Sequence, residues 1–181
     1  MIGIMEKEKL KEIYLAGGCF WGTEHYFKQV DGVVETEVGY ANGKVDNPTY
    51  QMVCSDSTGF AETVHVVYNP EKVSLRFLLN LYFMSIDPLS YNQQGFDRGS
   101  QYRTGIYYTD DADLEEINTA YAEEQKKYTQ PMAVEMERLT NFFVAEDYHQ
   151  DYLDKNPNGY CHLPRRLFEF ARKAKDSTVA Q

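Results

Sequence analysis

The segment most suited to chemistry is the run GGCFWG at residues 17–22, which follows the apolar stretch 13–16. Its two leading glycines allow a sharp turn from a strand into a helix, which would place Cys19 in the first turn of that helix. There the free backbone N–H groups and the helix dipole favour the thiolate and lower the pKa of the thiol. Cys19, flanked by apolar Phe20 and Trp21, is therefore a candidate nucleophile. The alternative is a buried structural cysteine.

A second candidate group is Glu62, at the start of the valine-rich run 60–68, which has the pattern of a strand. A carboxyl group beside Phe60 and Ala61 can be desolvated enough to stay protonated near neutral pH, and it can then act as a general acid. The alternative is a solvated glutamate at the edge of a strand.

Composition limits the class of protein. The chain has 181 residues, 43% of them hydrophobic, which suits one domain with a full core. We expect a single catalytic domain over residues 1–181, with its core at about 12–162 and flexible segments at 1–10 and 176–181. The net charge of −10 argues against nucleic acid and against an anionic membrane surface as partners.

The sequence also shows no clear membrane-spanning segment or signal peptide. No stretch approaches the roughly 20 apolar residues of a membrane helix, and residues 1–11 are charged where a signal peptide would be apolar. The three cysteines, Cys19, Cys54 and Cys161, form no CxxC pair, so neither a disulfide framework nor a zinc site is predicted. A transient catalytic disulfide remains compatible with a reducing compartment. These features favour a cytoplasmic enzyme without a metal.

Hydrophobic periodicity predicts alternating strands and helices. Strands are expected at residues 7–16, 33–40, 60–68, 106–109 and 134–139, the last strand of the chain, and helices at 19–30, 73–86, 110–128, 148–153 and 167–173. Segment 50–54 has no clear pattern, and residues 89–105 form a long polar loop, a kind that is commonly functional. We expect an α+β fold of four or five strands: a two-layer α/β sandwich (ferredoxin-like plait) with a central mixed sheet and long ordered coil segments.

Further motifs follow the GGCFWG run in a distinctive order. They are GYANG at 39–43, NPTY at 47–50, VCS at 53–55, TGFAE at 58–62, QGFDRGSQYR at 94–103 and KNPNGYC at 155–161. Together they resemble the A-type peptide-methionine sulfoxide reductases, which return methionine S-sulfoxide to methionine. The resemblance extends from about residue 14 to residue 161.

The resemblance implies roles for individual residues. Reducing a sulfoxide without metal or flavin needs a thiolate to attack the sulfur and an acid to protonate the oxygen, and these roles match Cys19 and Glu62. Tyr50 and Tyr102 match two tyrosines whose hydroxyls help to hold the sulfoxide oxygen, with ordinary packing as the alternative. Asp97 matches an aspartate that positions the substrate through its methionyl backbone, with turn capping as the alternative. No cofactor is implied.

The remaining implied roles concern selectivity and recovery. Phe20 and Trp21 match an apolar pocket that receives the methyl group on the sulfur, so that one epimer is preferred. The attack would leave Cys19 as a sulfenic acid, which condenses with a second thiol. Cys161 lies in a turn-rich, mobile surface segment and matches the resolving cysteine. Thioredoxin would then reduce the Cys19–Cys161 disulfide. Cys54 has no implied catalytic role, and apolar Val53 beside it suggests burial.

Two departures from the family pattern are visible. Phe60 stands where histidine is common, which changes the polarity expected around Glu62. No cysteine follows Cys161, so a cycle of two cysteines is implied. The implied substrate is methionine S-sulfoxide, in proteins or as the free amino acid, and we expect a monomer.

Two other functions remain open from the residues themselves. One is a cysteine hydrolase that pairs Cys19 with His25, His65 or His149. His25 lies six positions beyond Cys19 on the same expected helix, nearly two turns away and on a different face. The other is a non-catalytic module that binds peptides through aromatic loops.

Overall fold

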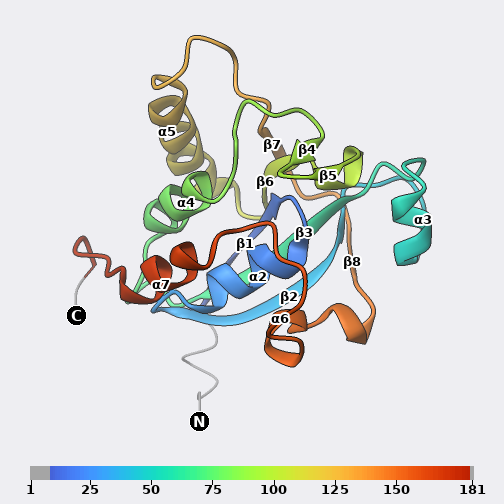
Figure 1. Cartoon of the computed structure of the whole chain (residues 1–181). Coiled ribbons are helices and arrows are strands. Elements are labelled where there is room, and N and C mark those ends of the chain that lie inside the picture. Colours follow the sequence, from blue (N-terminus) through green and yellow to red (C-terminus); the bar gives the residue numbers. More distant parts are fainter. Residues whose placement is uncertain (1–8, 180–181) are drawn as a thin grey trace.

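The chain, seen in a computed structural model that describes residues 9–179, is built on a curled sheet in the order β7-β6-β1-β3-β2-β8 (Figure 1). The strands of this sheet are β1 (Lys11–Gly17), β2 (Val33–Ala41), β3 (Ala61–Tyr68), β6 (Thr104–Tyr108), β7 (Glu135–Arg138) and β8 (Phe142–Val144). β6 and β7 are parallel and the other neighbours are antiparallel, so the sheet is mixed. A separate small ladder pairs β4 (Gln93–Gln94) with β5 (Asp97–Arg98).

Helices connect and cover these strands. They are α2 (Phe20–Lys28), α3 (Tyr50–Cys54), α4 (Leu75–Met84), α5 (Leu114–Gln125), α6 (Tyr152–Lys155) and α7 (Arg165–Lys173), with short 3₁₀ turns at Ser100–Tyr102, Asp111–Asp113 and Asp147–His149. None of the helices within residues 9–179 is long and apolar enough to cross a membrane.

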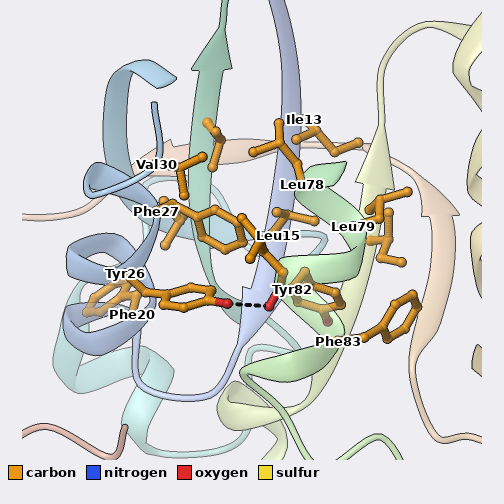
Figure 2. Packing of buried hydrophobic residues seen from close by; sticks show 14 of the residues in the cluster. Ile13, Leu15, Phe20, Tyr26, Phe27, Val30, Leu78, Leu79, Tyr82 and Phe83 are labelled. Atoms are coloured by element: carbon orange, nitrogen blue, oxygen red, sulfur yellow. Dashed lines mark hydrogen bonds between the residues drawn. The ribbon is translucent and has the colours of Figure 1, made fainter. Parts of the chain in front are cut away.

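The main core lies between one face of the sheet and helices α2 and α4. Because successive strand residues point to opposite faces, Ile13 and Leu15 of β1 face this core, whereas Tyr14 and Ala16 belong to a smaller cluster on the other face. Figure 2 shows the side chains of α2 and α4 meeting above β1. The Tyr26 hydroxyl donates to the carbonyl of Leu81 at 2.7 Å, which ties α2 to α4 inside the core.

Most expected elements are confirmed. The strands expected at 33–40, 60–68 and 106–109 and the helices expected at 19–30 and 73–86 occur within two residues at each end. Three expectations are wrong: the main sheet has six strands rather than four or five, β8 follows the strand that was expected to be the last, and the helix expected at 148–153 is replaced by a 3₁₀ turn at Asp147–His149 followed by α6. β8 has only three residues, too few for a periodic pattern, and its existence depends on pairing with the edge of β2. The result is a mixed α/β fold.

The two segments that sequence left undefined carry candidate site residues. Residues 89–105 contain the β4–β5 ladder and the 3₁₀ turn that ends at Tyr102, so this long loop is partly regular. Residues 50–54 form α3, which begins at Tyr50 and is capped by the Thr49 hydroxyl, an acceptor for the Met52 N–H at 3.2 Å.

The expected flexible segments, 1–10 and 176–181, lie largely outside the described residues, which exclude 1–8 and 180–181. Within the described part, the Asp176 carboxylate accepts hydrogen bonds from the Ser74 backbone N–H at 2.8 Å and from the Ser74 hydroxyl at 2.7 Å. This contact joins the end of the chain to the N-terminus of α4.

The strand that leads to Cys19 is held in place by a buried tyrosine of α4. The Tyr82 hydroxyl, fully buried, donates to the Ala16 carbonyl at 2.6 Å and accepts from the Gly105 N–H at 3.0 Å. It therefore joins β1 and β6 directly before the turn at residues 17–18.

Tyr82→Phe removes this hydroxyl, so the buried Ala16 carbonyl and the buried Gly105 N–H each lose their hydrogen bond to it. We expect the free energy of unfolding in urea to fall by about 1–3 kcal/mol. Tyr91→Phe is the matched control, because the Tyr91 side chain is 79% exposed and should leave stability unchanged. Equal stability of the two variants would contradict the role of the Tyr82 hydroxyl.

Candidate active site

Cys19 lies at the junction of β1 and α2, one residue before the helix begins. Gly18 has a φ of +91°, and a Cβ atom there would lie 2.7 Å from Cβ of Gln94, so this turn requires glycine. The Gln94 side chain is itself held by the backbone N–H and carbonyl of Asp87, both at 2.9 Å. Cys19 is thus the residue that precedes the first helical turn, close to the expected position within that turn.

Glu62, near the start of β3, is the buried acid of the site. Its side chain is 1% exposed, and Oε1 accepts a hydrogen bond from the Phe20 backbone N–H at 3.2 Å. Oε2 has no hydrogen-bond partner among residues 9–179. Burial raises the pKa of Glu62 to about 8, with a smaller contribution from the charge of Asp97. Glu62 is thus desolvated, as expected from its apolar neighbours, and its protonation near neutral pH stays a prediction.

Phe60, two residues before Glu62, is a buried apolar residue. Its ring is 1% exposed and packs edge to face against Phe143, with a centroid distance of 5.8 Å. On its other side it lies against Gly43, where a side chain would overlap the ring. An apolar residue at this position therefore brings no polar group or water toward Glu62.

The thiol of Cys19 differs from the sequence-based expectation. Its pKa lies well above the usual value for cysteine, first because the side chain is buried and second because Glu62 is close. A hydrogen bond from the Trp21 backbone N–H lowers the pKa but does not compensate. Desolvation of the thiolate thus acts against the lowering expected from the helix N-terminus and is the larger effect, so the pKa of Cys19 is raised.

Three other candidate residues surround this pair. The pKa of Tyr102 is raised by burial and by the charges of Glu62 and Cys19, so all three groups interact. The pKa of Tyr50 is likewise raised by burial and by Glu62. Asp97 is close enough to influence Cys19 and Glu62, and its carboxylate accepts a hydrogen bond from the Tyr160 hydroxyl at 2.9 Å.

Trp21 is oriented by two residues from the C-terminal part of the chain. Its indole Nε1–H donates to Nδ1 of His149 at 2.9 Å, and its ring stacks on Tyr152 with centroids 3.7 Å apart and planes at 10°. Phe20, by contrast, is 1% exposed and packs beside Tyr40 and the same histidine. Trp21 is thus the more accessible of the two aromatic neighbours of Cys19.

His149 and Glu146 have structural roles in the site that the sequence did not predict: His149 was considered only as the base of a cysteine hydrolase, and Glu146 was not considered. His149 is fully buried, its pKa is lowered by burial, and Nδ1 accepts from Trp21, so the neutral ring carries its proton on Nε2. Glu146 accepts from the Tyr50 backbone N–H at 2.9 Å and from the Tyr40 hydroxyl at 2.8 Å. The one available signal was the indole N–H of the single tryptophan, which needs an acceptor when it is half-buried.

The histidines do not supply a base for a cysteine hydrolase. His25 lies 3.5 Å from the Asp154 carboxylate. His65 stacks on Tyr14 with centroids 4.3 Å apart and contacts the Glu12 carboxylate at 2.5 Å. In the part of the chain that the structure describes, no histidine is hydrogen-bonded to Cys19, so this alternative lacks its second catalytic group.

Cys161 lies beside the helix that follows Cys19. A Cβ atom on Gly22 would be 3.1 Å from Sγ of Cys161, and Cys161 is close enough to influence the pKa of Cys19. Both thiols are free, and a pocket of about 240 Å³ borders Cys161. Cys54 is exposed rather than buried, because only Val53 of that pair faces the core. No cluster suited to a metal ion occurs within residues 9–179.

The buried acid generates a prediction about stability. The pKa of Glu62 is raised from 4.5 to about 8 on folding, so the folded chain binds a proton that the unfolded chain has released between these pH values. The free energy of unfolding should therefore fall as pH rises through this range, by up to about 1.4 kcal/mol per pH unit. Glu62→Gln should remove this slope and be more stable than the wild type at pH 8.

Urea unfolding at pH 5, 6, 7 and 8 measures the slope in both proteins. Glu35→Gln, at an exposed position of β2, is the control and should keep the wild-type slope. A wild-type stability that rises between pH 5 and pH 8 relative to Glu62→Gln would contradict a protonated, buried Glu62.

Comparison with known proteins gives a consistent result. The family model described as peptide methionine sulfoxide reductase matches residues 11–179. The peptide methionine sulfoxide reductase MsrA of Lachnoclostridium phytofermentans is 54% identical over 164 residues, which cover 91% of this chain and 99% of that protein. Among solved structures, reduced Mxr1 from Saccharomyces cerevisiae has a TM-score of 0.81 at 46% identity and covers 85% of this chain and 90% of its own.

A further solved structure is Mxr1 from Saccharomyces cerevisiae in complex with Trx2, with a TM-score of 0.54 and 32% identity over 80% of this chain and 86% of that one. The family match begins with the strand that leads to Cys19 and continues beyond the last helix, so it includes every residue of the site described above. The chain therefore belongs to the peptide methionine sulfoxide reductase family.

Proposed function

We propose that this enzyme reduces methionine S-sulfoxide, free or in proteins, by a cycle of two cysteines. The observation that carries the proposal is that the buried Glu62 carboxyl group, whose pKa is raised to about 8, accepts a hydrogen bond from the N–H of Phe20, the residue next to the buried Cys19 thiol. A sulfoxide needs a nucleophile at its sulfur and a proton at its oxygen, and Cys19 and Glu62 supply these.

In the first step, Sγ of Cys19 attacks the sulfoxide sulfur while Glu62 protonates the oxygen. The attack forms a bond between Sγ and the sulfoxide sulfur. This bond and the S–O bond then break as an Sγ–O bond forms, so methionine leaves, Cys19 becomes a sulfenic acid, and the substrate gains the two electrons that Cys19 loses. The proton released by the thiol replaces the one that Glu62 gave up. Because both groups are protonated in the free enzyme, attack and proton transfer must be coupled.

The surrounding residues would orient the substrate. The hydroxyls of Tyr50 and Tyr102 remain protonated, since burial raises their pKa values, and they can donate to the sulfoxide oxygen. Phe20 and Trp21 would receive the methyl group, and the contact of Trp21 with His149 fixes that surface. Asp97 would bind the methionyl backbone. Donors on one side and apolar rings on the other favour a single epimer.

In the second step, the Cys161 thiol displaces water from the Cys19 sulfenic acid and a disulfide forms. A dithiol protein then exchanges with this disulfide and returns both cysteines to thiols. Thioredoxin is the proposed reductant, and the complex of Mxr1 with Trx2 supports a partner of this kind.

We also propose the finer assignments that accompany this function. The strand order β6-β1-β3-β2, with α2 and α4 packed in one core, supports a ferredoxin-like plait as the centre of a single catalytic domain. The charge of −10 supports a protein without nucleic-acid or membrane partners. We propose a cytoplasmic monomer.

Glu62→Gln keeps an acceptor for the Phe20 N–H but has no proton to transfer. We expect the rate of methionine formation in a single turnover to fall by roughly 10²–10⁴, which is the usual contribution of a general acid. Rapid-quench measurement with a methionine S-sulfoxide peptide tests this, and exposed Glu35→Gln should react at the wild-type rate. An unchanged rate in Glu62→Gln would transfer the acid role to Tyr50, Tyr102 or water.

Cys161→Ser should form one equivalent of methionine per enzyme but should lose turnover with thioredoxin, because the sulfenic acid has no internal thiol to meet. Dithiothreitol should still support turnover. Cys54→Ser is the matched control and should retain activity with thioredoxin, whereas Cys19→Ser should form no methionine. A normal steady-state rate of Cys161→Ser with thioredoxin would refute the resolving role.

A further inference from the structure

The residue after Cys161 makes a specific contact with the turn that carries Cys19. Nε2 of His162 lies 3.0 Å from the Gly17 carbonyl oxygen. Because a carbonyl oxygen only accepts, the proton of the neutral ring is on Nε2, and His162 donates. Nδ1 is buried and has no hydrogen-bond partner among residues 9–179. The ring is therefore held by a single directed hydrogen bond, to a residue two positions before Cys19.

The His162 ring packs against two glycines, Gly18 and Gly22, where a side chain would collide with it. A Cβ atom on Gly22 would lie 2.9 Å from Nδ1 of His162 and 3.1 Å from Sγ of Cys161. A Cβ atom on Gly18 would lie 3.2 Å from Nε2. Two glycines of the GGCFWG run thus leave room for the pair formed by Cys161 and His162 to lie directly on the turn.

We propose that His162 is a positioning residue for disulfide formation, and that its hydrogen bond to Gly17 docks the Cys161 segment against the turn that carries Cys19. This inference rests on the proposed function, because it concerns the second step of that cycle. In this step the Cys161 thiol attacks Sγ of the Cys19 sulfenic acid, an S–S bond forms, the S–O bond breaks and water leaves.

The segment around Cys161 needs such an anchor. It connects α6 to α7 and contains the turn residues 156–159, of which residues 156–158 are exposed. Its other contact with the site is the bond from Tyr160 to Asp97, which lies on the opposite side of Cys161 in sequence. With His162 docked, the attacking thiol is held near its target, and such orientation commonly accounts for large rate effects.

His162→Leu tests the proposal because it replaces the ring with a branched apolar side chain that has no donor. We expect disulfide formation after one equivalent of sulfoxide to slow at least tenfold, while the methionine burst keeps its wild-type rate. His162→Gln should recover most of the rate, because its amide nitrogen is the same number of bonds from Cα as Nε2 of histidine. Rapid acid quench followed by mass spectrometry of the Cys19–Cys161 disulfide measures both steps.

Two comparisons and a replacement variant distinguish a role of His162 in positioning Cys161 from a general structural role. Turnover with dithiothreitol, which reduces the sulfenic acid directly, should be unchanged in His162→Leu, whereas turnover with thioredoxin should fall. Asn158→Ala, an exposed position in the same segment, should behave as the wild type in both assays. If His162→Leu does not fold, His162→Asn, whose shorter amide does not reach Gly17, replaces it, and the methionine burst reports an intact site.

The proposal would be overturned if His162→Leu formed the disulfide at the wild-type rate. It would also be overturned if His162→Gln slowed disulfide formation as much as His162→Leu. A wild-type enzyme that forms methionine but no Cys19–Cys161 disulfide would refute the proposed cycle and this inference together. Slow disulfide formation with a normal burst, recovered by glutamine, supports the inference alone.

Discussion

The hydrogen bond from the Phe20 N–H to Glu62 sets the geometry of the whole site. It joins the first turn of α2 to the start of β3, two segments that are 42 positions apart in the chain. Because Cys19 immediately precedes Phe20, the same contact fixes the position of Cys19 relative to Glu62. The Gly17-Gly18 turn, the Tyr82 hydroxyl beneath it and the sheet order that places β3 beside β1 all serve this arrangement.

Burial at this contact raises the pKa values of both Cys19 and Glu62. A thiolate and a carboxylate close together in an apolar site would each lose hydration and repel the other, so the pKa values of both Cys19 and Glu62 are raised. In the proposed mechanism, the free enzyme therefore holds Cys19 as a thiol. A substrate with a basic oxygen would remove the conflict, because it would accept the proton while its sulfur is attacked.

The C-terminal part of the chain completes the site with polar contacts that cross long distances in sequence. His149 orients Trp21, and Glu146 holds the backbone of Tyr50. His162 contacts Gly17, 145 positions earlier. The N-terminal strands and the turn before α2 thus carry Cys19 and Glu62, while the segments after β8 supply the acceptors for Trp21 and Tyr50 and also Cys161.

Local sequence patterns predicted several secondary-structure elements and the positions of two site residues. The alternation of 60–68 predicted β3 and the desolvated Glu62 at its start, and two glycines predicted the turn before Cys19. The tertiary structure alone decided the pKa of Cys19, the strand β8 and the partners of His149 and His162. A pKa depends on burial and on charges from distant segments, and a three-residue strand exists only through its neighbour. These properties depend on residues that are distant in sequence and become neighbours only in the folded chain, so a local sequence pattern does not predict them.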